Sequence, residues 1–201
     1  MLTYPGASVS ALIAAPIEAV WAQVSDPHNH PRLAGSGEVQ AIEVLGGVMG
    51  PGTVFQSQQQ MRGLSYVTAN RTVLWEPPAR FAWRVGFSFA PGVAQVWGFL
   101  LTAEEGGTWV ENGVALPYPL PTKPPFDRLH AEIGRREGSV IAPTLVNLAA
   151  ALGAPPPVHM VERHTAPEAL ADLLPPPLIQ AALIAGGAAV IWSLLRGSRR
   201  R

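Results

Sequence analysis

The chain has 201 residues, of which 48% are hydrophobic and 14% are charged, and its formal net charge is zero. This composition suits one domain of ordinary size with a large core, plus an appendage, and it argues against a disordered chain. The absence of cysteine excludes disulfides, thiolate nucleophiles and zinc–thiolate sites.

The charges are unevenly distributed along the chain. Four of the 14 basic residues are arginines in the last six positions, which leaves 10 basic against 14 acidic side chains in residues 1–195, a net charge of −4. A mildly acidic body argues against nucleic acid as a partner. No Lys or Arg precedes Arg32, and a secretory signal needs such a charge, so we expect the body to fold in the cytoplasm.

The first predicted elements are a strand and a helix. Residues Ala7–Ala14 are short, apolar and partly alternating, which is typical of a strand. Pro16 suits the first position of a helix, and Ser25-Asp26-Pro27 ends it. Apolar residues at helical spacing give this helix one buried face, formed by Ile17, Val20, Trp21 and Val24.

Six strand-like segments follow after a polar stretch. Their connectors are short and contain turn-forming pairs such as Gly-Gly and Pro-Gly. Because a parallel crossover needs about a dozen residues, consecutive strands are predicted to form antiparallel hairpins. The segments are Glu38–Leu45, Thr53–Met61, Leu64–Trp75, Arg80–Phe89, Val93–Thr102 and Thr108–Leu116.

The period then changes from that of a strand to that of a helix. Apolar residues recur at helical spacing from Phe126 to Leu152, which predicts one long helix. Pro143 should kink or interrupt this helix, because proline lacks the backbone donor. Pro155–Pro157 ends the domain, and Thr165–Leu174 has the capping-box spacing of a short helix. An α+β fold follows, in which the long helix covers one face of a curved antiparallel sheet.

Several stretches resemble the SRPBCC, or START-like, superfamily, and within it the polyketide cyclase/dehydrase group. They are "IAAPIEAVWAQVSDP", "GTVF", "TVLWEPPARFAWRV" and "WGFLLTAEEGGTWVENGVAL". The resemblance implies a helix-grip fold, in which the sheet wraps around the long helix and an apolar cavity. It divides the chain into a family domain (1–154), a proline-rich linker with a possible short helix (155–175) and an appended C-terminal segment (176–201).

Alternating aromatic residues mark a candidate ligand site. In "RFAWRVGFSF" one face carries Phe81, Trp83, Val85, Phe87 and Phe89, and Trp97 and Phe99 begin a second row. These rings either line a cavity for a hydrophobic ligand or fill an ordinary core. The candidate ligand-binding residues are Phe55, Tyr66, Trp83, Phe87, Trp97 and Phe99.

Candidates for catalysis and metal binding are weaker. Cyclase-type chemistry needs an acid and a base, and His130, Arg62 and Glu111 are candidates, although no spacing specifies a pair. His28 and His30 in "PHNHP" are predicted to lie in a solvated loop without a third metal ligand. No metal site is predicted, and no phosphate loop or dinucleotide motif is present, so we expect no cofactor.

These observations leave three functions open. The first is binding or carriage of a small hydrophobic ligand, such as a lipid or a polyketide-like molecule, at a membrane. The second is a polyketide cyclase/dehydrase-like enzyme that acts in the same cavity. The third is an interaction protein whose cavity is packed shut.

The C-terminal segment predicts the membrane association. Leu178 to Leu195 is an 18-residue run without charge, and at about 1.5 Å per residue it spans roughly 27 Å, close to a hydrocarbon core of about 30 Å. We expect a transmembrane helix that anchors the chain, with residues 1–174 in the cytoplasm. The four terminal arginines oppose this orientation, because positive charges favour the cytoplasmic side.

Overall fold

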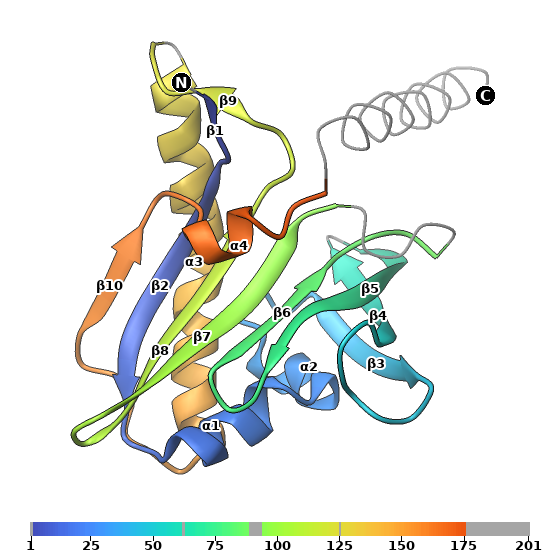
Figure 1. Ribbon diagram of the computed structural model, residues 1–201, viewed down its shortest axis with the longest axis vertical. Coiled ribbons are helices and arrows are strands. Elements are labelled where there is room, and N and C mark those ends of the chain that lie inside the picture. Colours follow the sequence, from blue (N-terminus) through green and yellow to red (C-terminus); the bar gives the residue numbers. More distant parts are fainter. Residues whose placement is uncertain (1, 62, 89–93, 125, 176–201) are drawn as a thin grey trace.

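The computed structural model of the protein describes residues 2–61, 63–88, 94–124 and 126–175 (Figure 1). Its elements in chain order are β1 (Leu2–Thr3), β2 (Gly6–Ile13), α1 (Ile17–Val24), η1 (Pro27–Asn29), α2 (His30–Leu33), β3 (Val39–Leu45), β4 (Val54–Met61), β5 (Leu64–Glu76), β6 (Arg80–Arg84), β7 (Val96–Glu104), β8 (Gly107–Ala115), β9 (Leu120–Pro121), α3 (Phe126–Ala151), β10 (Met160–Arg163) and α4 (Glu168–Ala171).

Eight strands form one antiparallel sheet in the order β10-β2-β8-β7-β6-β5-β4-β3. From β3 to β8 the neighbours in the sheet are also neighbours in the sequence, which confirms the predicted series of hairpins. The short strands β1 and β9 form a separate pair. One edge of the sheet is therefore formed by β10, next to β2, and these two strands come from opposite ends of the described chain.

Helix α3 runs along one face of this sheet, behind β2 and β8 in the view of Figure 1. Its fully buried residues Ile141, Leu145 and Leu148 belong to the same apolar cluster as Val9 of β2 and Val110 of β8. This arrangement confirms the predicted α+β helix-grip fold. The appended hydrophobic helix that we expected lies in residues 176–201, outside the described residues.

Helix α3 continues through Pro143, so of the two predicted effects of this proline the interruption does not occur. Pro143 and Ser139 are both exposed, so the carbonyl group that loses its helical donor lies on the solvent side. The same turn of the helix is stabilised on its buried side. There Thr144 is buried, and its hydroxyl group donates a hydrogen bond to the carbonyl oxygen of Val140 at 3.2 Å. Packing and hydration therefore offset the missing backbone bond.

The two glycines of α3 are buried where the C-terminal part of the chain packs on the helix. A Cβ atom at Gly134 would lie 2.4 Å from the Cβ atom of His164, much closer than such atoms approach. At Gly138 such an atom would lie 3.9 Å from the carboxylate of Glu162. Gly134 thus permits close packing of α3 against the residue that follows β10.

Residues 155–175 are not simply a linker. Strand β10 pairs antiparallel with β2, and α4 lies across the outer face of the sheet, where Leu170 is fully buried. A Cβ atom at Gly98 would lie 2.7 Å from Leu170, and one at Gly113 would lie 2.7 Å from Pro167. We call residues 160–175 the strap, because they cover the sheet edge and then its outer face.

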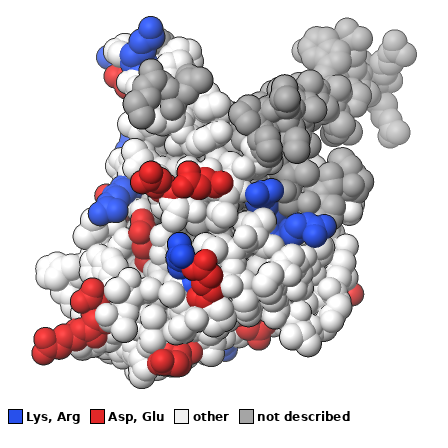
Figure 2. All heavy atoms as spheres, viewed as in Figure 1, with Lys and Arg blue, Asp and Glu red and all other residues white. Residues whose placement is uncertain are grey.

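Within the described part of the chain, no helix has the length and apolar character needed to cross a membrane. The predicted span, residues 178–195, lies outside that part. Figure 2 shows that charged side chains on this face form small groups of both signs among uncharged surface. On this face the described residues form no continuous basic stripe, the feature typical of nucleic-acid binding.

Candidate ligand-binding cavity

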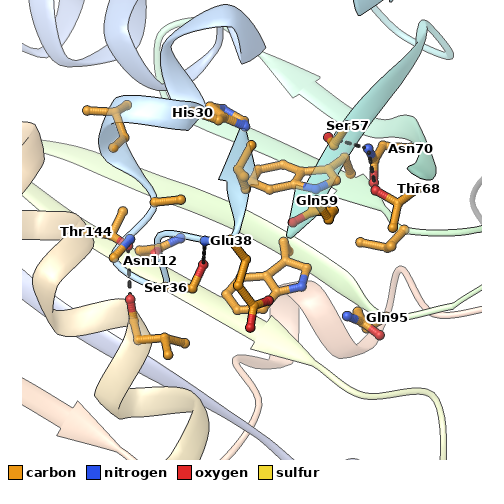
Figure 3. Close-up of a pocket in the computed structure, with 18 of the residues that line it drawn as sticks. His30, Ser36, Glu38, Ser57, Gln59, Thr68, Asn70, Gln95, Asn112 and Thr144 are labelled. Atoms are coloured by element: carbon orange, nitrogen blue, oxygen red, sulfur yellow. Dashed lines mark hydrogen bonds between the residues drawn. The ribbon is translucent and has the colours of Figure 1, made fainter. Parts of the chain in front are cut away.

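A cavity of about 310 Å³ lies between the inner face of the sheet, the loop between α2 and β3, and the middle of α3 (Figure 3). Strands β4 to β8 contribute side chains that point inward, and α3 contributes Arg136, Glu137, Val140 and Thr144. Small-molecule sites usually measure about 300–1,000 Å³, so this cavity is at the lower end of that range.

One wall of the cavity is aromatic. Trp83 of β6 lies opposite Trp97 of β7 in the sheet register, so both rings lie on the inner face. The ring of Trp83 is 6.3 Å from that of Phe99 and 6.3 Å from that of Phe55. The two phenylalanines are buried, whereas the two tryptophans are only partly buried. This wall provides flat apolar surface against which a ring system can pack.

A second wall is polar, and its side chains hold one another in place. Asn70 of β5 donates from Nδ2 to the hydroxyl oxygen of Ser57 at 2.9 Å and to the carbonyl oxygen of Phe55 at 3.3 Å. Asn112 of β8 donates to the carbonyl oxygen of Gly98 at 2.9 Å. Thr68 lies opposite Ser57 in the register and faces the same side. The cavity is therefore amphipathic rather than purely apolar.

His30 lies on the cavity wall and is 7% exposed. Asp26 caps the short η1 helix by accepting a bond from the backbone N–H of His28 at 3.0 Å, and α2 begins directly afterwards with His30. The centre of the imidazole ring lies 5.0 Å from that of Trp83 and 6.3 Å from that of Phe55. The prediction that this residue lies in a solvated loop is wrong, because α2 folds its first residue inward.

The protonation of His30 follows from its surroundings. Burial lowers the pKa of this imidazole below its ordinary value of 6.5, and the bond to Val24 and the charge of Asp26 offset that effect only in part. His30 is therefore neutral near pH 7. Its Nε2 atom lies 2.9 Å from the carbonyl oxygen of Val24. A carbonyl oxygen can only accept, so Nε2 carries the proton and Nδ1 retains its lone pair.

The loop after α2 is fastened to α3, which fixes the position of His30. The backbone N–H of Gly35 donates to the hydroxyl oxygen of Thr144 at 2.9 Å, and Asn147 donates to the carbonyl oxygen of Leu33 at 3.1 Å. A Cβ atom at Gly35 would lie 2.4 Å from the carbonyl oxygen of Val140, so glycine is required for this close approach. The cavity wall formed by this loop is thus held on the helix.

Charged and polar residues with more exposure lie at the other end of the cavity. They include Glu38, Tyr66, Arg136 and Glu137. Burial raises the pKa of Glu137, Arg136 lowers it in part, and Glu38 raises it further. Burial and the charge of Glu38 also raise the pKa of Tyr66, which is 37% exposed. We call this end the mouth.

The structure brings together five of the six predicted ligand-binding residues. The cavity is lined by Phe55, Tyr66, Trp83, Trp97 and Phe99. Phe87 is not among the lining residues and is 50% exposed. Strand β6 ends at Arg84, and Val85 still lines the cavity, so the row of inward side chains ends between Val85 and Phe87.

The three catalytic candidates are not brought together. Arg62 lies outside the described residues. Glu111 faces Ser10 and Leu100 in the register, whereas the next residue, Asn112, lines the cavity, so Glu111 belongs to the outer face. His130 is partly buried on α3, with Nε2 3.5 Å from the carbonyl oxygen of Leu120, and it does not line the cavity.

The sequence did not predict that His30 lies in the cavity, nor the polar wall of Ser57, Thr68 and Asn70 or the more distant Asn112 on β8. The polar wall had a signal, because Ser57 follows Phe55 at a spacing of two and therefore shares its face. In the described ranges, no group of His, Asp or Glu side chains could hold a metal ion. Likewise, no described acidic group forms an ion pair or side-chain hydrogen bond with His30. The walls can bind a ring system and satisfy polar substituents, and His30 can accept a proton or a hydrogen bond.

An antiparallel sheet that grips a long helix around a cavity defines a helix-grip domain of the ligand-binding type. The profile of the family described as polyketide cyclase/dehydrase and lipid transport matches residues 6–153, and the chain belongs to this family. The resemblance drawn from the sequence is thereby confirmed. No curated protein matches the chain at a significant level.

Solved structures share the fold at low sequence identity. Protein NE0264 from Nitrosomonas europaea is 18% identical with a TM-score of 0.55, over 74% of this chain and 94% of its own. The di-domain aromatase/cyclase StfQ of the steffimycin pathway is 13% identical with a TM-score of 0.54, over 75% of this chain and 50% of its own. The ZhuI aromatase/cyclase from Streptomyces sp. R1128 is 13% identical with a TM-score of 0.50, over 76% and 94%. At these identities the likeness concerns the fold.

Proposed function

We propose that this protein binds a small hydrophobic ligand, lipid or polyketide-like, in the cavity between the sheet and α3. The observation that carries the proposal is the cavity itself, which has a volume of about 310 Å³ and an aromatic wall. An interaction protein with a closed core would have packed these positions with side chains. The polar wall adds that the ligand carries oxygen or nitrogen substituents as well as apolar surface.

Native mass spectrometry of the full chain, extracted gently from cells, tests this proposal. We expect a complex of one chain with one small organic molecule, which organic solvent removes and which rebinds to the stripped protein. A chain that is free of ligand, and that does not bind the total apolar extract of the same cells, would contradict the proposal.

A second candidate function is the cyclase/dehydrase-like reaction in the same cavity. The observation that favours it is His30, a neutral buried imidazole whose Nδ1 atom retains its lone pair and is suited to remove a proton. The mass of the ligand distinguishes the two functions. A carrier releases the molecule unchanged, whereas a dehydrase releases a product that has lost one molecule of water.

We also propose that Leu178 to Leu195 holds the domain at a membrane, with the cavity domain in the cytoplasm. The support is the 18-residue uncharged run, and Trp192 next to the arginines suits a membrane interface. Removal of residues 176–201 is expected to leave the cavity domain intact and to move it to the soluble fraction. A full chain that is already soluble after a salt wash would contradict the anchor, and protease protection of residues 1–175 would reverse the orientation.

A further inference from the structure

The hydrogen-bonding capacity of His30 is only half used by the protein. Its Nε2–H is directed to the carbonyl oxygen of Val24, at 2.9 Å. Among the described residues, none makes a hydrogen bond with the other ring nitrogen, Nδ1. The residue is more than nine-tenths buried, and it lines the cavity. In the described part of the chain, the enclosed side-chain atoms without a partner are the hydroxyl oxygens of Ser8 and Thr72 and do not include Nδ1. Nδ1 is therefore accessible from the cavity, where a ligand can supply the partner that the protein does not.

The surroundings define which chemical group this partner carries. The rings of Phe55, Phe81 and Trp83 lie 5.0–6.3 Å from the imidazole ring, so its neighbourhood is mostly apolar. With Nε2 protonated, Nδ1 is an acceptor and needs a donor. In this apolar neighbourhood a neutral hydroxyl group costs much less to bury than a charged ammonium group.

We propose that His30 determines the specificity of the cavity by accepting, at Nδ1, a hydrogen bond from a hydroxyl group of an aromatic or similarly flat ligand. This inference rests on the proposed binding function and extends it to the chemical class of the ligand. The cavity then prefers a phenol or an alcohol to a hydrocarbon of the same shape. The apolar part of the ligand packs on Trp83 and Trp97, and its hydroxyl group lies at His30.

Two probes of nearly equal shape test the proposal on the full chain. They are 2-naphthol, which has a hydroxyl donor, and 2-fluoronaphthalene, which has none. Isothermal titration calorimetry gives the ratio of their dissociation constants. A titration without protein measures the heat that the probe produces by itself, and this heat is subtracted. One net hydrogen bond corresponds to roughly a two- to tenfold change in affinity. We therefore expect the preference for 2-naphthol over 2-fluoronaphthalene, expressed as the ratio of their dissociation constants, to fall roughly two- to tenfold when Nδ1 is removed.

Two variants and one control separate specificity from folding. His30→Gln keeps an N–H group for the carbonyl oxygen of Val24 and replaces Nδ1 by an amide oxygen as the remaining acceptor, whereas His30→Phe keeps a ring and has no acceptor. His159→Gln, at an exposed position outside the cavity, should leave the ratio unchanged. In addition, ¹⁵N resonances of the imidazole should show Nε2 protonated, and naphthol should shift the Nδ1 resonance.

The possible results are distinct. A ratio that falls in folded His30→Phe but not in His159→Gln supports the proposal. An unchanged ratio in folded His30→Phe, or an equal fall in His159→Gln, overturns it while probe binding itself continues to support the proposed function. Failure of wild-type protein to bind either probe would contradict both the proposed function and the role of His30.

Discussion

At the scale of single residues, burial of the His30 imidazole makes the fold sensitive to acid. Its pKa is lowered in the folded protein below the ordinary 6.5, so between these two values the unfolded chain binds more protons. Stability is therefore fully present above about pH 6.5 and falls as the pH falls below it. Glu137 acts in the opposite direction, because its raised pKa lets the folded state keep a proton to higher pH.

We predict that His30→Gln makes the free energy of unfolding less dependent on pH as the pH falls below about 6.5. The slope contributed by one such group is at most about 1.4 kcal/mol per pH unit. Chemical denaturation at several pH values measures it, and the difference between wild type and variant cancels the contribution of Glu137. His159→Gln, at an exposed position, is the matched control. Equal slopes for wild type and His30→Gln would contradict the assignment of a buried neutral imidazole.

The cavity residues differ in how well the local sequence pattern predicts their positions. Strict alternation placed Trp83 and Trp97 on one face, and the structure lines the cavity with both. The same alternation does not hold at Phe87, which lies beyond Val85, the last residue of this row in the cavity, and is 50% exposed. His30 lies in a polar stretch that is typical of a surface loop, and its burial depends on α2 packing against α3, a contact distant in sequence. No local periodicity reports such a contact.

At the scale of elements, the strap turns a proline-rich segment into part of the domain. The sheet and α3 were predictable because their apolar periods are long and regular. The strap was predictable only in part. The short helix α4 falls within the predicted Thr165–Leu174, although Pro167 and not Thr165 is at its N-cap. Strand β10 was not predicted, because it has only four residues, too few for a period to be recognised. A further signal of the strap lay in Gly98 and Gly113 on the outer face, where the missing side chains make room for Leu170 and Pro167.

We predict that Leu170→Ala destabilises the domain by about 2–5 kcal/mol, the usual cost of removing a fully buried leucine side chain. Leu170 is 0% exposed and contacts Gly98 across the outer face of the sheet. Urea denaturation of residues 1–175 measures the loss, and Glu168→Ala, at an exposed position in the same short helix, serves as the control. A loss below about 0.5 kcal/mol would show that the strap is not part of the folded core.

At the scale of the whole molecule, the domain combines a rigid frame with a cavity that has two different ends. The His30 end is buried among aromatic rings, and the mouth carries Glu38, Arg136 and Glu137. The family model matches residues 6–153, and the strap beyond it covers β2 and the outer face of the sheet. The family resemblance implied that a cavity exists. Its polar wall was not predicted, because it depends on which face of each strand turns inward.

The central claim is that the cavity binds a small hydrophobic molecule, and a cavity-filling substitution tests it most directly. Thr68 lines the cavity, whereas its neighbour Val67 is 46% exposed on the opposite face of the same strand. The full chain, Thr68→Trp and Val67→Trp are titrated with the apolar fluorophore N-phenyl-1-naphthylamine. Wild type and Val67→Trp should bind one probe per chain with similar affinity, and Thr68→Trp should bind roughly tenfold more weakly or not at all. Equal binding by all three proteins, or no saturable binding by wild type, would contradict the claim.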